Sequence, residues 1–437
     1  MILHAPGQSE HGYLVPRPQA WFAFILSFLL MTFDFIDRQI VVSMFPYLKA
    51  EWSLSDRELG ALISIVSFTI AVGTVPLSLL VDSWSRVKGV AMMATVWSLA
   101  TIACGFAGSY QRLFMARAFI GLGEAGYGPA AGAILSSMFP TRLRATIIGG
   151  FLAAASFGSV LGVVLGGLIA ARWGWQAAFG IVGVPGLLLS LLYMFVRDYR
   201  APEIETHSLN RLSKARAITG ELFRARSGIA ACFAGALQLI TASTILAWLP
   251  SFFNRYYGLP ADRSGVWAAA IIVCATVGAV FWANVADRLA RRDIRFRMLT
   301  AAACCLTTLG LFATAFGALA PGTLQIALLV LGAFTMTGTT GPVPAVAIDV
   351  VHPALRSTAG SMVAIVQNLF GLGIGPLISG ALSDAFGLQA AMAIMPVSCG
   401  FAALLLMLGS RFYAADRDAL ARLEVRADVA AAVPATA

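Results

Sequence analysis

The sequence of 437 residues carries little charge, since Asp, Glu, Lys and Arg together make up 12% of it. Soluble domains contain about 25% charged residues, because charged side chains cover a surface that faces water. The low share therefore excludes a cytosolic enzyme of this length. The hydrophobic share of 59% and the aromatic share of 11% also exclude a disordered chain.

Cysteine and histidine are scarce, with six and four copies. The cysteines all lie in apolar stretches and none forms a C-x-x-C pair: Cys104, Cys232, Cys274, Cys304, Cys305 and Cys399. The histidines lie outside the apolar stretches: His4, His11, His207 and His352. A disulfide framework, a metal centre and a membrane-embedded enzyme site would each need residues that are missing. We expect buried, reduced thiols, no metal, no cofactor and no enzymatic activity.

Long apolar runs are what the sequence has instead. A helix that crosses a bilayer needs about 20 apolar residues, and the sequence contains enough windows of this kind for 12 transmembrane helices. The first six windows cover residues 20–45, 58–81, 89–108, 111–138, 145–171 and 175–196, and the second six cover 228–253, 264–286, 297–318, 322–349, 357–382 and 387–409. We therefore expect an all-α polytopic membrane protein. The first window contains Asp34 and Asp37 and lacks a cleavage site, which predicts a retained span rather than a signal peptide.

The connection between the sixth and seventh windows is the longest and is rich in charge. It predicts a solvated linker between two halves of the chain. The expected organisation comprises a cytoplasmic N-terminal tail (1–19), a six-helix bundle (20–196), the cytoplasmic linker (197–227), a second six-helix bundle (228–409) and a cytoplasmic C-terminal tail (410–437).

The basic residues predict the orientation of these spans. Most of the 30 Lys and Arg residues fall on the side of the termini and the linker. The opposite loops hold Lys49, Arg57, Arg112, Arg172, Arg255 and Arg263. Cytoplasmic loops are enriched in Lys and Arg, so both termini are expected in the cytoplasm, with the chain in the plasma (inner) membrane. Basic loops that face anionic headgroups also account for the net charge of +9, and we expect no nucleic-acid partner.

The two halves repeat each other in sequence. The segment GWQAAF at 174–179 corresponds to GLQAAM at 387–392, and Arg144-Ala145-Thr146 corresponds to Arg356-Ser357-Thr358. Because six spans separate the copies, both have the same orientation in the bilayer. A parallel duplication of this kind predicts two pseudo-symmetric halves around a central site, as in alternating-access carriers.

A motif between the second and third spans resembles the signature of the major facilitator superfamily. This signature contains a glycine, an aspartate four residues later and then basic residues. The first copy here is Ser78-Leu79-Leu80-Val81-Asp82-Ser83-Trp84-Ser85-Arg86, followed by Lys88. The second copy is Ala283-Asn284-Val285-Ala286-Asp287-Arg288-Leu289-Ala290-Arg291-Arg292. Small residues replace the family glycines, and the resemblance extends over about residues 20–410.

The resemblance implies that these residues form a latch at the inner gate. In the family, the aspartate lies at a helix end and contacts basic residues when the gate is shut. The matching positions are Asp82, Arg86, Lys88, Asp287, Arg288 and Arg291. The alternative is that they serve only as topology charges, although Asp82 contributes nothing to such a signal. Asp349 is expected to be a further gate acid of the second copy.

Two spans of the first half resemble those of Spinster-like transporters. The matching segments are FIDRQI at 35–40 and RAFIGLGEAG at 117–126. The anion:cation symporters share an Asp-Arg pair in the first span and a Gly-Glu-Ala segment in the fourth. The first resemblance implies lysolipids, sphingoid phosphates or related amphiphiles as substrates, and the second implies small organic anions.

Ionisable side chains inside the apolar windows are few and costly, so they normally mark function. Asp34, Asp37 and Arg38 are spaced to share one face of the first span, and Arg117 and Glu124 share one face of the fourth. We expect a network in which Asp37 and Glu124 face Arg38, with Arg117 nearer one end. A purely structural cluster is the alternative, but buried pairs often fail to repay their desolvation.

A carboxylate beside an arginine can act as a proton switch. Charged Asp37 would pair with Arg38, whereas protonated Asp37 would release Arg38 to bind an anionic headgroup or Glu124. The segment GLGEAG at 121–126 also matches the dinucleotide fingerprint GxGxxG, but no strand precedes it. We expect its glycines, like Gly158, Gly162 and Gly166, to serve close helix packing.

The second half offers polar rather than charged candidates. The candidates for the cavity include Gln238, Thr241 and Asn368, whereas Trp248 fits an interfacial anchor by default. Charge on one half and apolar surface on the other predict a substrate with an anionic or zwitterionic head.

The sequence therefore predicts a secondary active transporter of the major facilitator fold, proton-coupled and acting as a monomer on an organic anion or lysolipid-like amphiphile. A proton-driven multidrug exporter, a symporter of small carboxylates, a membrane enzyme and an ion channel are the alternatives. An enzyme would need a nucleophile and base within a span, and a channel would favour a symmetric pore.

Overall fold

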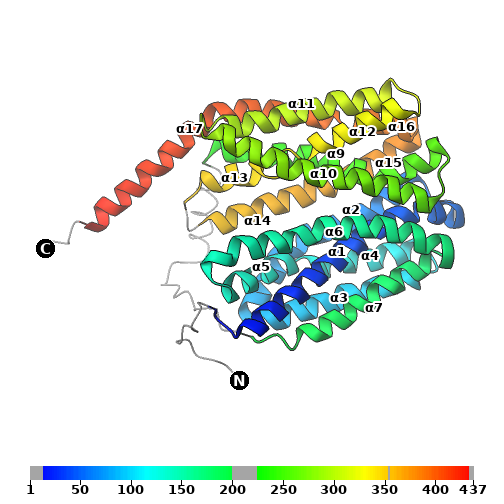
Figure 1. Cartoon of the computed structure of the whole chain (residues 1–437), viewed down its shortest axis with the longest axis horizontal. Coiled ribbons are helices and arrows are strands. Elements are labelled where there is room, and N and C mark those ends of the chain that lie inside the picture. The colour runs from blue at the N-terminus through cyan, green and yellow to red at the C-terminus, as the bar shows by residue number, and fades with distance from the viewer. Residues whose placement is uncertain (1–12, 199–223, 353–354, 433–437) are drawn as a thin grey trace. The chain divides into compact units, whose positions relative to one another are not determined.

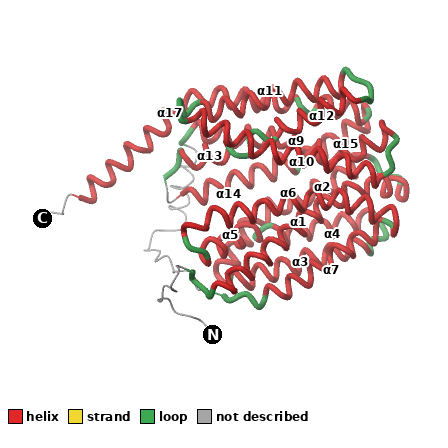
Figure 2. The backbone as a smooth tube through the Cα atoms, in the orientation of Figure 1, coloured by secondary structure: helices red, strands yellow, loops and turns green. Residues whose placement is uncertain are grey.

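The computed structural model describes residues 13–198, 224–352 and 355–432. Within these ranges every regular element is a helix, and Figure 2 draws no strand there. Helices satisfy their backbone N–H and C=O groups internally, which a chain inside a bilayer requires. The predicted linker 197–227 and the two predicted tails lie largely or partly outside the described residues, although the last helix continues to Ala432.

The helices follow the apolar windows of the sequence. The first half contains α1 (Arg17–Trp52), α2 (Asp56–Trp84), α3 (Arg86–Gly105), α4 (Tyr110–Glu124), α5 (Tyr127–Met138), α6 (Thr141–Trp173) and α7 (Trp175–Tyr193). The second half contains α9 (Arg226–Tyr257), α10 (Ala261–Ala290), α11 (Phe296–Gly317), α12 (Thr323–Met336), α13 (Pro342–Asp349), α14 (Arg356–Val366), the π-helix η2 (Gln367–Leu372), α15 (Gly375–Phe386), α16 (Leu388–Ile394) and α17 (Val397–Ala432).

Several predicted spans are interrupted near the middle. The fourth is divided between α4 and α5 at Ala125–Gly126, and the tenth is divided between α12 and α13 at residues 337–341. Glycine at both interruptions lowers the cost of leaving helical geometry. Within the described residues, 10 helical segments are long and apolar enough to cross a membrane. Counting each interrupted pair as one crossing gives the 12 spans that the sequence predicts.

The described residues group into two compact units. Of the described residues, the first unit contains 13–198, Ser243–Val273 and Leu372–Ala391, and the second contains 224–242, Cys274–Gly371 (without 353–354) and 392–432. The first unit therefore contains one end of α9, one end of α10 and all of α15 in addition to the first-half helices. This grouping follows contacts rather than the sequence repeat, so the predicted bundle boundaries at 20–196 and 228–409 stay a prediction.

Glycines bring α1 and α6 together in the first unit, where the two helices lie side by side (Figure 1). A Cβ atom on Gly162 would lie 2.7 Å from the Ile36 carbonyl oxygen, and one on Gly166 would lie 3.0 Å from the Ser43 Cβ. Small residues allow such close backbone approach between membrane helices. The contact fixes the segment of α1 that carries the intramembrane charges.

Two glycines of the segment 121–126, which matches the dinucleotide fingerprint, also allow close helix packing around α4. A Cβ atom on Gly123 would lie 2.7 Å from the Trp97 backbone nitrogen of α3, and one on Gly121 would lie still closer to the Val66 carbonyl oxygen of α2. Close helix packing thus accounts for both glycines. It also holds the neighbouring Glu124 at a fixed place in the unit.

We predict that Gly162→Ala destabilises the protein by about 1–3 kcal/mol, because the added methyl group forces α6 away from the Ile36 carbonyl. Gly149→Ala is the matched control on the same helix, since a Cβ atom there has nothing within 4 Å. Thermal unfolding of the two purified variants in detergent measures the difference. Equal unfolding temperatures would contradict the role given to the α1–α6 contact.

Candidate functional site

Arg38 joins two acidic residues from different helices of the first unit. Its Nε atom lies 2.9 Å from Asp34 Oδ1 on α1, and its Nη2 atom lies 2.9 Å from Glu124 Oε2 at the end of α4. The guanidinium contacts the two acids through different nitrogens, so its planar geometry determines how far apart they stand. The structure thus brings together three of the five charged residues singled out in the sequence.

The partner of Arg38 on its own helix differs from the expected one. The sequence suggested Asp37, but the ion pair forms with Asp34, one turn earlier, because residues four apart lie one above the other on a helix. The Phe35 ring lies beside the guanidinium, with 4.9 Å between Arg38 Cζ and the ring centroid. The Arg38 side chain remains 22% exposed, whereas those of Asp34 and Glu124 are 4% and 0% exposed. Arg38 is therefore the most exposed member of the cluster.

Asp37 lies in a different environment on the same helix. It is 1% exposed, and neither carboxylate oxygen has a hydrogen bond within the described part of the chain. The guanidinium charge of Arg117 and the Thr101 side chain act on this carboxylate, but the Thr101 hydroxyl donates to the Trp97 carbonyl at 2.9 Å. A buried carboxylate without a hydrogen bond is costly, and protonation would remove its charge.

Arg117 is the second buried cation and is 1% exposed. Its Nε atom donates to the Leu62 carbonyl of α2 at 2.7 Å, which fixes the side chain between α4 and α2. Its Nη1 atom has no hydrogen bond among the described residues. Arg117 and Asp37 therefore form a second, looser charge centre beside the Arg38 cluster.

Hydrogen bonds to Ser27 of α1 hold the helix in place near this region. The Tyr127 hydroxyl of α5 donates to the Ser27 carbonyl at 2.6 Å, and the Ser27 hydroxyl lies 3.0 Å from the Tyr193 hydroxyl of α7. All three side chains are fully buried. They hold α1 against α5 and α7 about two turns before Asp34 along the helix.

The first copy of the predicted inner-gate motif is described only in part. The Asp82 side chain lies outside the described residues. The Ser85 hydroxyl accepts from the Lys88 backbone at 3.1 Å at the start of α3 and contacts Asp198 Oδ2 at 2.6 Å. The Lys88 Nζ atom lies 5.9 Å from the Trp84 ring centroid. The latch role of Asp82, Arg86 and Lys88 stays a prediction.

The second copy of the motif centres on a residue that the sequence did not single out. Arg297, at the start of α11, lies 3.1 Å from Asp287 and also pairs with Asp349. The Tyr413 hydroxyl of α17 donates to Asp349 at 2.8 Å. Arg288 and Arg291 are exposed. Arg297 was overlooked because it stands among five arginines of one loop, and spacing alone does not separate it from the others.

The polar candidates of the second unit take part in contacts between helices. Gln238 of α9 donates to the Met336 carbonyl and accepts from the Thr339 hydroxyl at 2.8 Å. The Thr241 hydroxyl lies 2.8 Å from that of Ser398. Asn368, within η2, donates to the Ala364 carbonyl, while its buried Oδ1 atom has no partner among the described residues. Of the three, Asn368 retains a buried acceptor that no described residue uses.

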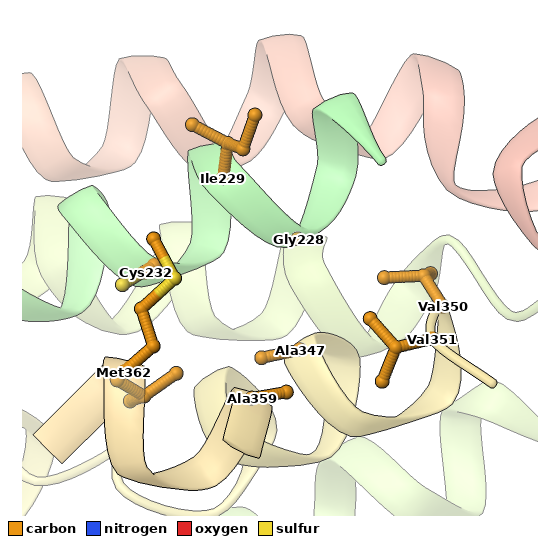
Figure 3. A pocket seen from close by; sticks show the side chains of 9 residues that line it. Gly228, Ile229, Cys232, Ala347, Val350, Val351, Ala359 and Met362 are labelled. Atoms are coloured by element: carbon orange, nitrogen blue, oxygen red, sulfur yellow. The ribbon is translucent and has the colours of Figure 1, made fainter. Parts of the chain in front are cut away.

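An apolar cavity lies between α9, α13 and α14 in the second unit (Figure 3). Its walls include Cys232, Ala347, Val350 and Met362. None of the described residues that line it is charged, so they offer no group that would bind a charged head. It is separate from the Arg38 cluster, which belongs to the first unit.

A third charged cluster lies where α2 begins and was not expected from the sequence. Asp56 accepts from both terminal nitrogens of Arg255, at 2.6 and 2.7 Å, and from Lys49 at 2.5 Å. The Ser383 hydroxyl of α15 donates to the same carboxylate. An acid in the first turn of a helix is common, because it stabilises the helix dipole, so Asp56 carried no distinguishing signal.

Comparison with known proteins agrees with this architecture. An efflux pump of the same superfamily from Mycolicibacterium smegmatis is 27% identical over 86% of each chain. A hexuronate transporter from Bacillus subtilis is 23% identical over 82% of this chain and 87% of that one. An uncharacterised transporter, YybO, from the same bacterium is 27% identical, but the match spans 64% of its length.

The fold also matches a solved structure of a bacterial homologue of the human lysosomal transporter Spinster, in an inward-facing and occupied conformation. The TM-score is 0.82 at 21% identity, and the match covers 92% of this chain and 99% of that one. The profile of the Major Facilitator Superfamily matches residues 27–372. These findings confirm the fold expected from the sequence, and the chain belongs to the major facilitator superfamily.

Proposed function

We propose that the chain is a proton-coupled secondary transporter for an organic anion, with Arg38 as the residue that binds its anionic group. The observation that carries the proposal is the position of Arg38, held by two carboxylates at 2.9 Å while its own side chain stays partly exposed. An intramembrane cation of this kind is a site for charge recognition by default. The hexuronate relative is named for a substrate that carries a carboxylate.

The charge balance of the cluster supports coupling to protons. Three carboxylates (Asp34, Asp37 and Glu124) accompany two guanidiniums (Arg38 and Arg117), so the fully ionised group carries one net negative charge. An approaching anion would be repelled until one carboxylate takes up a proton. Proton and anion therefore favour each other's binding, and this coupling is reciprocal. Mutual enhancement of this kind produces symport.

Asp37 is the acid that we assign to the proton. Asp34 and Glu124 each form an ion pair with Arg38, whereas Asp37 has neither an ion pair nor a hydrogen bond among the described residues. Neutral Asp37 would leave Arg117 without a nearby counter-charge. Arg117 could then attract one of the acids that hold Arg38, which would free the Arg38 guanidinium for the anion.

The proposed orientation follows from the basic loops and places the Asp56 end of α2 outside the cell and both termini in the cytoplasm. The fold is that of carriers that act as single chains in the bilayer, which is the expected state here. An amphiphile with an anionic head, such as a lysolipid, remains within the proposal because it offers Arg38 the same group. A multidrug exporter is the competing proposal, since one relative is named an efflux pump.

Proteoliposomes that contain a pH-sensitive dye test the coupling. Addition of D-glucuronate or lysophosphatidylglycerol, in separate experiments, should acidify the lumen if either compound enters with a proton. Alkalinisation would indicate exchange and contradict symport. Proton movement driven only by a cationic drug, with neither anion active, would favour the exporter instead.

Arg38→Lys is expected to weaken anion binding by at least about tenfold, because lysine keeps the charge but cannot span two acids with a planar fork. Arg112→Lys, an exposed position on α4, is the matched control and should bind normally. Isothermal titration with the anion that passes the flux assay measures both variants. Normal binding by the Arg38 variant would make the arginine structural.

Asp37→Asn is expected to bind the anion without its dependence on pH and to lose accumulation against a gradient, because the amide imitates the protonated acid permanently. In the wild type, binding should strengthen as the pH falls, since a bound proton favours the anion. Glu124→Gln should weaken binding and accumulation together. Binding at several pH values and uptake with an imposed pH gradient provide the measurements. Gradient-driven accumulation by Asp37→Asn would move the coupling role to Asp34 or Glu124.

A further inference from the structure

Three residues of α1 lie in one line along the helix. Arg38, Phe45 and Lys49 are spaced by seven and eleven residues, which places them on nearly the same face. At a rise of 1.5 Å per residue, Phe45 lies about 10 Å from Arg38, and Lys49 lies one turn further. Each of the three contacts a different partner in the first unit. The line therefore runs from the charged site to the C-terminal end of α1, which lies near Asp56.

Phe45 meets Trp248 of α9 at the middle of this line. The ring centroids are 5.2 Å apart, at an angle of 50° between the planes. Phe45 is 1% exposed and Trp248 is fully buried, and the following Phe252 and Phe253 are also fully buried. The complete burial of Trp248 argues against the alternative, raised by the sequence, that it is an interfacial anchor. The pair forms an apolar layer beyond Arg38.

Lys49 meets Asp56 at the end of the line, where the third charged cluster lies. Arg255 follows Trp248 by seven residues, so α9 presents its tryptophan and its arginine on one face, in the same order as α1 presents Phe45 and Lys49. The Asp56 side chain is 3% exposed and the Arg255 side chain 29% exposed. An ionic layer thus covers the aromatic layer.

Backbone contacts draw α15 to the same place. The Asp384 carboxylate accepts the backbone N–H groups of Asp56 at 2.8 Å and Arg57 at 2.9 Å, which caps the start of α2 from another helix. A Cβ atom on Gly380 would contact the Asp56 carbonyl, and one on Gly60 would contact the Pro376 carbonyl. Helix α15, from the second half of the sequence, is therefore packed tightly against α2.

Helix α10, also from the second half of the sequence, packs closely against α6. A Cβ atom on Gly265 would lie 2.7 Å from the Val163 carbonyl, and one on Gly167 would lie 2.6 Å from the Ala261 carbonyl. Segments of α9, α10 and α15 thus belong to the same compact unit as the first-half helices.

We infer that these two layers are the outer gate of the transporter in its closed state, with Phe45 and Trp248 as a water-excluding plug and Asp56 as the acid that latches it. The inference rests on the proposed orientation and on alternating access. Arg255 and Ser383 come from the second half of the sequence, so their bonds to Asp56 are the ones that must break when the halves separate. Lys49 comes from the same half as Asp56 and stays with it.

Because Asp56 has partners from both halves of the sequence, the gate can open without leaving the Asp56 carboxylate unpaired. Asp56 keeps the Lys49 ammonium as its counter-charge, and Arg255 is already partly exposed and can be hydrated. A latch that consisted of a single buried pair would strand a carboxylate in an apolar place each time it opened. The third charge therefore makes the latch reversible.

A cysteine placed beneath the plug tests the gate directly. Val42→Cys lies on the same face of α1 between Arg38 and Phe45, and a membrane-impermeant thiol reagent added to intact cells can reach it only from outside. The parent without this cysteine measures the background of the six native thiols. In the Val42→Cys protein we expect slow labelling. Asp56→Asn and Arg255→Gln should each raise its rate about tenfold by shifting the population toward the open gate.

Three comparisons separate a latch from general damage to the fold. The double variant should label no faster than either single variant, because both remove the same interaction. Arg255→Lys, which keeps a cation beside Asp56, should label more slowly than Arg255→Gln. Asp262→Asn, an acid in the first turn of α10, is the matched control and should label slowly. Unchanged rates in both single variants, or an equal rise in the control, would overturn the latch.

Substitutions of Trp248 test the plug separately from the latch. Trp248→Ala should raise the labelling rate although the latch is intact, whereas Trp248→Phe keeps the aromatic contact and should label slowly. An unchanged rate in Trp248→Ala would overturn the plug. None of these measurements needs a substrate or a pH gradient, so failure of the proposed anion symport would leave the result on the gate intact.

Discussion

The charge of Arg38 is the constraint around which the first unit is arranged. A guanidinium at this depth in a bilayer needs counter-charges, and Asp34 and Glu124 provide them from two helices. Glu124 is the last residue of α4, and the negative end of the helix dipole therefore points toward the same cation. The glycines that bring α1 against α6 and α4 against α3 are what allow these short distances.

The sequence predicts the fold well, because membrane helices are specified by long apolar runs. It also predicts which side chains form the charged site, since a charge inside an apolar window has few harmless explanations. It did not predict that Arg38 would choose Asp34 over Asp37. Asp34 stands four residues before Arg38 and Asp37 adjoins it, and residues four apart, unlike adjacent ones, lie one above the other on a helix, so the spacing rule applied to Arg38 itself would have selected Asp34.

Ion pairs between residues far apart in the chain could not be predicted from the sequence, for a related reason. Asp56 and Arg255 are 199 residues apart in the chain. Each has an ordinary local explanation, Asp56 as an acid in the first turn of a helix and Arg255 as an outer-loop cation. The same holds for Arg297, which stands in a loop of similar arginines and is selected by the packing of α11 against α13 and α17. Periodicity assigns a residue to a helix face, but only the packing of helices shows what that face meets.

The interruptions of the fourth and tenth spans are equivalent positions of the duplication. α4 ends at Glu124 and α12 ends at Met336, and the distance between them in sequence equals that between Arg144 and Arg356. The first copy has an acid at the break and the second has an apolar side chain. The helix interruptions thus occur in both copies, whether or not a charged side chain stands at the break. A carrier of this kind can therefore acquire a new specificity by exchanging one side chain at an interruption that already exists.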